Sequence, residues 1–374
     1  MQQKANTPDT HGSPNKRRIA LALQGGGSHG AFTWGVLDRL LEEPSFEIVG
    51  ISGTSAGAMN AGLLADGLRR GGASQARHAL RKYWEDVGRL PGYASLWPLG
   101  PQHTWHLDEN PAFRWADMLT RIWSPYQINP SNYNPLRKLL ERIDFEALRH
   151  DPRAPRVFIC ATNVRTGLRR VFHNAELSPE VLLASACVPQ LYQAIQIGED
   201  FYWDGGYTGN PALAPLYLAT SATDLIVVGI NPIERTTVPR TARAIIDRVD
   251  EISFNSTFML ELGAIAFIEN LVKSVAVQAP VRLLHAHGIG DEALGSFGAS
   301  SKMNNDWGFP QHLHELGSRA ADRWLAENLT EVGKRSTVDL SGLVPPDGGL
   351  LTSPSFLNKT QLSTSNAAAQ ECLI

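Results

Sequence analysis

The sequence predicts an α/β fold in which a mostly parallel sheet is covered by helices on both faces. Short apolar runs, typical of buried strands, recur along the chain and alternate with segments of helical periodicity. Each of the first two runs ends in a glycine-rich turn that leads into a helical segment. The predicted strands are Ile19–Leu23, Ile48–Ile51, Val157–Ala161, Val171–His173, Leu225–Ile230 and Val281–His285, with a further strand-like stretch at Ala194–Ile197.

Composition favours a soluble enzyme. The chain has 374 residues, of which 43% are hydrophobic, enough for one large core and a cap. A net charge of −3 gives no reason to expect a nucleic acid partner. No apolar run approaches the roughly 18 residues of a membrane-spanning helix, and the polar N-terminal residues lack a signal core. We therefore expect a cytoplasmic protein, with peripheral contact at a membrane surface left open.

The first predicted strand, Ile19–Leu23, is followed by the turn Gly-Gly-Gly-Ser-His-Gly. Three successive glycines leave neighbouring backbone N–H groups bare, so that they can converge on one oxygen atom, as in an oxyanion hole. Gly25, Gly27 and Gly30 also satisfy the spacing of a nucleotide-binding loop. That alternative needs an acidic residue at the end of the second strand, where this chain has Ser52–Ser55.

The second strand ends in Gly53-Thr54-Ser55-Ala56-Gly57, a serine between glycines ahead of a helix of small residues. A serine hydroxyl is a poor nucleophile unless the backbone holds it out at a strained turn, and such a turn needs neighbours with almost no side chain. The helix directs its free N–H groups to the same place and favours negative charge there. The alternative is an ordinary tight strand–helix connection.

A third motif, Asp204-Gly205-Gly206, follows the strand-like stretch at Ala194–Ile197. A carboxylate followed by two glycines can approach another backbone closely, although an isolated Asp-Gly-Gly is also a common turn. Together, the serine turn, the glycine loop and a lone carboxylate are the parts of an acyl-transfer site.

With these three motifs in this order, the chain resembles the patatin-like phospholipases, serine lipid acyl hydrolases that use a Ser–Asp dyad. The likeness covers roughly residues 17–333, and the segment 178–189 resembles the helix that precedes the Asp turn in that family. The resemblance implies a three-layer patatin-like fold, a lipid or other hydrophobic ester as substrate and no cofactor. It implies Ser55 as nucleophile and Asp204 as general base. The oxyanion loop would be Gly25, Gly26 and Gly27, chiefly through the amides of the last two, with His29, Gly30, Gly53, Gly57, Gly205 and Gly206 as supporting motif residues.

One position departs from the family pattern. Many members carry Arg or Lys where this chain has His29, so a fixed positive charge beside the oxyanion loop is not assured. We expect His29 to pack the loop, with a pH-dependent electrostatic role as the alternative.

The expected chemistry follows from the residue types. A free Asp, with a pKa near 3.9, is a weak base. Burial away from cations would strengthen it, and the helix behind Ser55 would favour the alkoxide. Ser55 would attack the ester and form an acyl-enzyme, which water activated by Asp204 would hydrolyse. This cycle requires no metal, and His285 and His287, which alternate along a strand without companion ligands, are expected to be structural.

Two alternatives remain open. A Ser-His-Asp hydrolase would recruit one later histidine, but that architecture places several strands before its nucleophile, and only one or two fit before Ser55. A catalytically silent lipid-binding relative is the second alternative, although none of the motif residues is missing. The candidate histidines for a triad are His285, His287, His312 and His314.

Composition also divides the chain. Residues 1–16 are expected to be a disordered tail, 17–333 the acyl hydrolase domain and 334–374 a mostly flexible tail. Within the domain, residues 91–135 are rich in Trp, Tyr and Pro and are expected to form a cap over the acyl pocket or a patch resting on lipid. A second small hydrophobic cluster is the alternative. The apolar helix expected at 258–277 is assigned to the core or the pocket wall.

Overall fold

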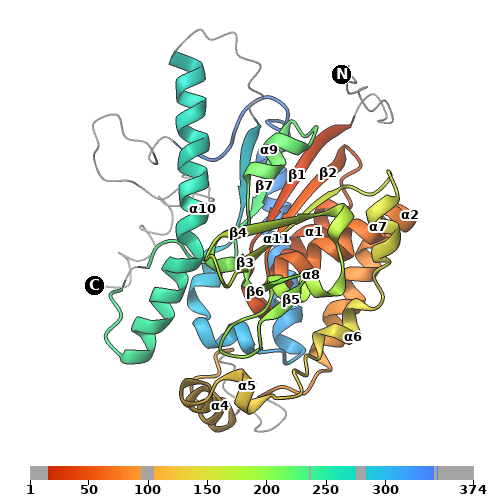
Figure 1. Ribbon diagram of the computed structural model, residues 1–374. Helices are drawn as coiled ribbons and strands as arrows, with labels where there is room; N and C mark the ends of the chain where they lie inside the picture. Colours follow the sequence, from red (N-terminus) through yellow and green to blue (C-terminus); the bar gives the residue numbers. More distant parts are fainter. Residues whose placement is uncertain (1–15, 94–104, 236, 275–283, 341–342, 344–374) are drawn as a thin grey trace, which may run out of the picture.

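The computed structural model describes residues 16–93, 105–235, 237–274, 284–340 and 343. Its centre is an eight-stranded sheet (Figure 1). The strands are β1 (Arg17–Leu23), β2 (Phe46–Gly53), β3 (Arg156–Asn163), β4 (Arg169–His173), β5 (Ile195–Ile197), β6 (Asp200–Asp204), β7 (Asp224–Val228) and β8 (His285–Ile289).

The sheet is mixed and mostly parallel, as the sequence predicts. Five strands run parallel in the order β3-β2-β1-β7-β8. At the β3 end, β4 and β6 pair antiparallel with β3, and β5 pairs antiparallel with β6. The sequence analysis missed β6, because Tyr202–Tyr207 has the composition of a turn. It also placed the last strand too early: β8 begins at His285, and residues 281–283 lie outside the described part of the chain.

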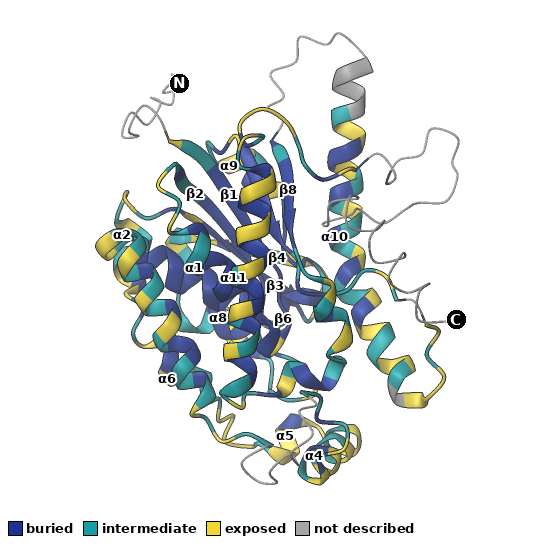
Figure 2. Ribbon diagram, turned by 180° about the vertical axis from the view of Figure 1, so that it is seen from behind, coloured by how far each residue is buried: buried dark blue, intermediate teal, exposed yellow. Residues whose placement is uncertain are grey.

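The first strand shows why helices cover both faces. Successive side chains of a strand point to opposite faces, and every residue from Ile19 to Leu23 is fully buried. Ile19, Leu21 and Leu23 belong to one hydrophobic core, whereas Ala20 and Ala22 belong to a second core. The sheet therefore has no solvated face here, and the molecule has three layers, with the strands buried between helices (Figure 2).

The larger core lies under α1 (Gly30–Leu40), α2 (Ala56–Gly88), α8 (Pro179–Ser185) and α11 (Gly308–Asn328). Helices α1 and α11 pack closely at two glycines. A Cβ atom at Gly35 would lie 2.0 Å from the carbonyl oxygen of His314, and one at Gly317 would lie 2.1 Å from that of Phe32. Only glycine allows this crossing.

The second core lies under α9 (Ala214–Ala219) and the long helix α10 (Ala242–Ser274). The helix starts earlier than the sequence analysis expects, and its apolar residues divide between two environments. Phe258 and Leu262 are buried against the sheet, whereas Leu260 is 73% exposed. By length and composition, the 26 residues Ala244–Glu269 would suffice to cross a membrane, although the sequence analysis expects no such segment. In this structure one side of that helix covers the sheet.

Between α2 and β3 the chain forms α4 (Pro111–Ile122), α5 (Pro125–Ile128), α6 (Leu136–Leu140) and α7 (Phe145–His150). The first two come from the predicted insertion at 91–135, of which residues 94–104, including Trp97, lie outside the described residues. Trp105 stacks on Phe309 of α11, with ring centroids 5.2 Å apart. Short 3-10 helices complete the fold: η1 (Gly27–His29), η2 (Asn174–Glu176), η3 (Gly205–Tyr207), η4 (Glu292–Ser296) and η5 (Ala299–Met303).

The predicted tails are described only in part. Of the N-terminal tail, residues 1–15 lie outside the described residues. Residues 334–340 pack against β8, where the N–H groups of Thr337 and Val338 donate to the carbonyl oxygen of Ala286, and Val338 and Leu340 are buried in the second core. The packed chain thus continues beyond residue 333, and the division into domain and tails stays a prediction.

Candidate active site

Ser55 stands at the turn between β2 and α2 with φ 54° and ψ −121°. A non-glycine residue rarely adopts a positive φ, and such strain persists only where the surroundings enforce it. The two motif glycines make room for the turn. A Cβ atom at Gly53 would lie 2.4 Å from the carbonyl oxygen of Gly57, and one at Gly57 would lie 2.1 Å from that of Leu23. The turn is therefore the strained strand–helix elbow that the sequence predicts.

Two hydrogen bonds fix this elbow. The N–H of Ser55 donates to Ser185 Oγ at 2.9 Å, and the hydroxyl of Thr54 donates to the carbonyl oxygen of Gly209 at 2.7 Å. Ser185 is fully buried at the end of α8. The sequence analysis recognised the segment that contains Ser185 but gave this residue no role, because nothing in the local pattern indicates what a buried serine bonds.

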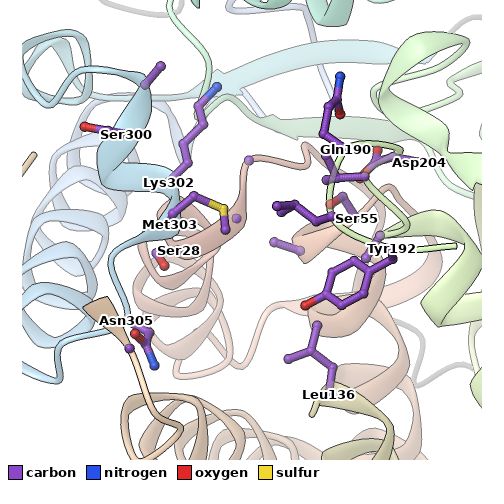
Figure 3. A pocket seen from close by; sticks show the side chains of 18 of the residues that line it. Ser28, Ser55, Leu136, Gln190, Tyr192, Asp204, Ser300, Lys302, Met303 and Asn305 are labelled. Atoms are coloured by element: carbon purple, nitrogen blue, oxygen red, sulfur yellow. The ribbon is translucent and has the colours of Figure 1, made fainter. Parts of the chain in front are cut away.

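Asp204 ends β6 beside Ser55. Along β3, Gly53 of β2 pairs with Ile159 and Asp204 of β6 pairs with Ala161, two residues further on. Ser55 likewise lies two residues beyond Gly53. Ser55 and Asp204 therefore lie at about the same level along β3, close to Ala161. Their side chains meet on one side of the pocket (Figure 3), and a hydrogen bond from Ser55 is among the interactions that lower the pKa of Asp204.

Burial dominates the electrostatics of Asp204. It raises the pKa of this carboxyl to about 7, against the hydrogen bonds from Gly206 and Ser55 and the charge of Lys302, which all lower it. The N–H of Gly206 donates to Asp204 Oδ1 at 2.8 Å. A Cβ atom at Gly205 would lie 2.1 Å from the carbonyl oxygen of Cys160, so the glycine after the aspartate allows the close backbone approach that the motif predicts. A carboxyl with a pKa near neutrality is suited to general base catalysis.

The glycine loop lies directly against the elbow. A Cβ atom at Gly25 would lie 2.7 Å from that of Ser55. The N–H of Gly25 already donates to Asn210 Oδ1 at 2.7 Å, so Gly25 holds the loop in place and its amide is not free for an oxyanion. Gly26 and Gly27 line the pocket together with Ser55.

His29 packs the loop from beneath. Its Nε2 lies 2.7 Å from Ser301 Oγ, and its ring contacts those of Phe297 and Phe309 edge-on. Burial, and after it the charge of Lys302, lowers the pKa of His29 to about 3. The imidazole is therefore uncharged near neutral pH, which supports the packing role over the pH-dependent one.

The histidines of the triad alternative lie elsewhere. His287 is fully buried, with Nε2 3.0 Å from Asp224 Oδ1 and Nδ1 2.9 Å from Thr337 Oγ1. Within the described residues, the lining of the pocket at Ser55 contains no histidine. The other candidates, His285, His312 and His314, are therefore also absent from the lining of this pocket.

A cavity of about 1000 Å³ opens beside Ser55 and Asp204, at the upper end of the range for ligand pockets. Its walls are mostly apolar. Phe113 of α4 contributes to one wall, and Ile246 and Phe254 of α10 contribute to another, so both the predicted insertion and the long helix line the pocket. The other apolar lining residues include Met59, Tyr83, Trp84, Val87, Leu90, Leu136, Val188 and Tyr192.

The strained serine elbow, the buried aspartate and the glycine loop thus lie together at one pocket, which is the arrangement expected of a Ser–Asp acyl hydrolase. The chain belongs to the patatin-like phospholipase family, whose family model matches residues 21–217.

Similarity to solved structures is distant. The crystal structure of VipD from Legionella pneumophila is 14% identical, with a TM-score of 0.37 over 82% of this chain and 68% of VipD. The type III effector protein ExoU is 17% identical, with a TM-score of 0.26 over 80% of this chain and 54% of ExoU. ExoU in its complex with SpcU from Pseudomonas aeruginosa gives 17% identity and a TM-score of 0.29, over 85% and 61% of the two chains. None of the curated proteins compared matches this chain.

Proposed function

We propose that the protein hydrolyses carboxylic esters of lipids through an acyl-enzyme on Ser55, with Asp204 as general base. The observation that carries this proposal is the contact between a strained serine and a carboxyl with a pKa of about 7 at the wall of a large apolar cavity. Membership of the patatin-like phospholipase family supports the class of reaction.

In this mechanism, Asp204 takes the hydroxyl proton as Ser55 attacks the ester carbonyl. Gly26 and Gly27 line the pocket beside Ser55, and their amides would receive the developing oxyanion, where one well-placed donor contributes roughly 3–4 kcal/mol. Asp204 returns this proton to the leaving alkoxide, which departs as the alcohol and leaves an acyl-serine. Asp204 then activates a water molecule, which releases the fatty acid and regenerates the hydroxyl. The apolar cavity holds the acyl chain.

We also propose that α4 rests on the lipid surface from which the substrate enters. Trp115 and Ile122 are 64% and 63% exposed, and Met118 lies between them on the same helical face. The opposite face of α4 lines the pocket through Phe113, so a lipid-bound α4 would place the pocket beside its substrate. In vesicle flotation, Trp115→Ser/Ile122→Ser should bind phospholipid vesicles less than the wild type does. Equal binding of vesicles by the variant and the wild type would contradict a lipid-binding role for these exposed residues.

The function is tested directly by a fluorophosphonate probe and a p-nitrophenyl acyl ester. The wild-type protein should be labelled at Ser55 and should cleave the ester, whereas Ser55→Ala should do neither. Comparing the two proteins on mixed cell lipids then identifies the substrate. A catalytically silent lipid-binding protein would show neither labelling nor cleavage in the wild type.

A further inference from the structure

A lysine from the C-terminal part of the chain lies against the glycine loop. Lys302 belongs to η5, between β8 and α11, and lines the pocket together with Gly26 and Gly27. Gly27 has φ 57°, and a Cβ atom there would lie 2.3 Å from the carbonyl oxygen of Lys302. Figure 3 shows Lys302 on one side of the pocket and Ser55 with Asp204 on the other. The loop is thus enclosed between the nucleophile and this lysine.

A side-chain relay connects the ammonium group to the loop. Lys302 Nζ donates to Asn231 Oδ1 at 2.9 Å, and Asn231 Nδ2 donates to the carbonyl oxygen of Gly25 at 2.7 Å. The same Nδ2 lies 3.3 Å from Gln24 Oε1. Because both ends of the buried Asn231 amide are bonded, its orientation is fixed. The bond to the Gly25 carbonyl also fixes the peptide group between Gly25 and Gly26, to which the Gly26 N–H belongs.

The charges that act on Lys302 come from helix α10 and from Arg235. On α10, Glu251, Asp250 and Asp247 raise its pKa, whereas burial, the largest influence, and Arg235 lower it, for a net lowering. Glu251 is itself bonded by Arg235.

On the loop side, the charge of Lys302 acts on His29 and Asp204 and lowers the pKa of both groups. Arg121 is another basic residue of the pocket lining, but it is bonded to Asp117 within α4. Lys302 is therefore the lysine whose charge reaches both the loop and the general base.

We propose that Lys302 is a positioning residue of this site, which through Asn231 holds the glycine loop with its amides toward the substrate and whose charge stabilises the oxyanion. The cation that position 29 lacks is supplied instead from position 302. This inference rests on the proposed ester hydrolysis, because it assigns a role within that reaction.

The test compares Lys302→Met with Lys302→Arg on a p-nitrophenyl ester. Without the charge, kcat should fall about 10- to 100-fold, with KM changed less than about threefold, because the contribution belongs to the transition state. Lys302→Arg should recover most of kcat. Equal losses in both variants would overturn the proposal, since shape and not charge would then decide the rate.

The pH profile separates this role from a merely structural one. The charge of Lys302 lowers the pKa of Asp204, and the base must be ionised to act. The acid limb of kcat/KM should therefore move to higher pH in Lys302→Met and stay in place in Lys302→Arg. The matched control, Lys334→Met, removes an exposed lysine remote from the pocket lining and should change neither rate nor limb. An unmoved limb in Lys302→Met contradicts the proposal.

Asn231→Asp provides a second route should Lys302→Met fail to fold. It keeps the shape of Asn231, loses the donor to Gly25 and neutralises the ammonium, so kcat should fall and the acid limb should again move upward. A kcat within threefold of wild type with an unmoved limb overturns the proposal. Failure of the wild type to react with the fluorophosphonate would instead refute the ester hydrolysis itself, so the two failures are distinguishable.

Discussion

The central sheet contains two buried aspartates with opposite electrostatics. Asp204, at the end of β6, is 1% exposed, and Asp224, at the start of β7, is fully buried. Burial raises the pKa of Asp204 to about 7. Burial also acts to raise the pKa of Asp224, but hydrogen bonds outweigh it, and the pKa is lowered.

The number of donors accounts for the difference. Asp224 Oδ1 faces His287 Nε2 at 3.0 Å and accepts from the N–H of Gly333 at 2.7 Å, while Oδ2 accepts from the hydroxyl of Thr223 at 2.6 Å. Asp204 has the N–H of Gly206 and the hydroxyl of Ser55. Burial alone therefore does not make a base. A buried carboxylate with few hydrogen-bond donors has a raised pKa and is suited to act as a base. A buried carboxylate with several donors has a lowered pKa and serves the structure.

The largest effect on turnover should come from replacing Asp204 by asparagine. The same substitution at Asp224 is the comparison. Asp204→Asn should lower kcat on a p-nitrophenyl ester by about 10³- to 10⁴-fold, because an amide cannot accept the serine proton. Asp224→Asn, measured per folded molecule, should stay within about threefold of wild type. Comparable losses of turnover at the two positions would remove the functional distinction between them.

Stability should respond in the reverse order. Asp224→Asn should lower the free energy of unfolding at pH 7 by about 1–3 kcal/mol, because a buried carboxylate that bonds Gly333, Thr223 and His287 is replaced by a neutral amide. The lowered pKa of Asp224 contributes stability above its unfolded value of 3.8, and that contribution is lost as pH falls through the folded pKa. Urea titrations at pH 7 and at a pH well below 3.8, such as pH 2.5, should show the deficit of the variant shrinking at the lower pH. A deficit independent of pH would contradict the assignment.

At Asp204 the sign is opposite. With a folded pKa of about 7 against 3.8 for a free aspartate, the carboxyl makes the fold less stable as pH rises from about 4 to 7. Asp204→Asn removes that penalty, so its Tm should exceed that of the wild type at pH 8, by the equivalent of up to roughly 4 kcal/mol, and approach it near pH 4. Differential scanning calorimetry at the two pH values measures this, and a destabilised variant at pH 8 contradicts it.

The smallest effects should be those of the histidines outside the pocket. Alanine at His285, His312 or His314 should leave kcat/KM within a few-fold of wild type. Alanine at His287 should lower stability through Asp224 without changing the turnover of the folded protein. Loss of orders of magnitude in turnover at any of the four would restore a Ser-His-Asp mechanism.

Sequence reasoning found the parts of the site that are local. Ser55 and its glycines stand within five residues of one another, so the local pattern alone is enough to indicate the turn. The alternation along β1 likewise predicts a sheet covered on both faces, because the direction of each side chain follows from strand geometry.

What sequence reasoning missed depends on contacts between distant segments. Strand β6 reads as a turn because its pairing with β3 is set by tertiary structure. Gly25 is withdrawn from the oxyanion donors by Asn210, far along the chain. Lys302 lies in a polar segment without a motif, and its position beside Gly27 follows from the packing of η5 against η1.

The glycine crossing of α1 and α11 has a consequence for that last contact. Helix α1 begins where the glycine loop ends, and α11 begins shortly after η5, so the tight fit at Gly35 and Gly317 sets how near the lysine comes to the loop. Bulk added at either glycine should therefore separate the two segments without altering any residue that lines the pocket. The position of the lysine beside the loop thus depends on two glycines that do not themselves line the pocket.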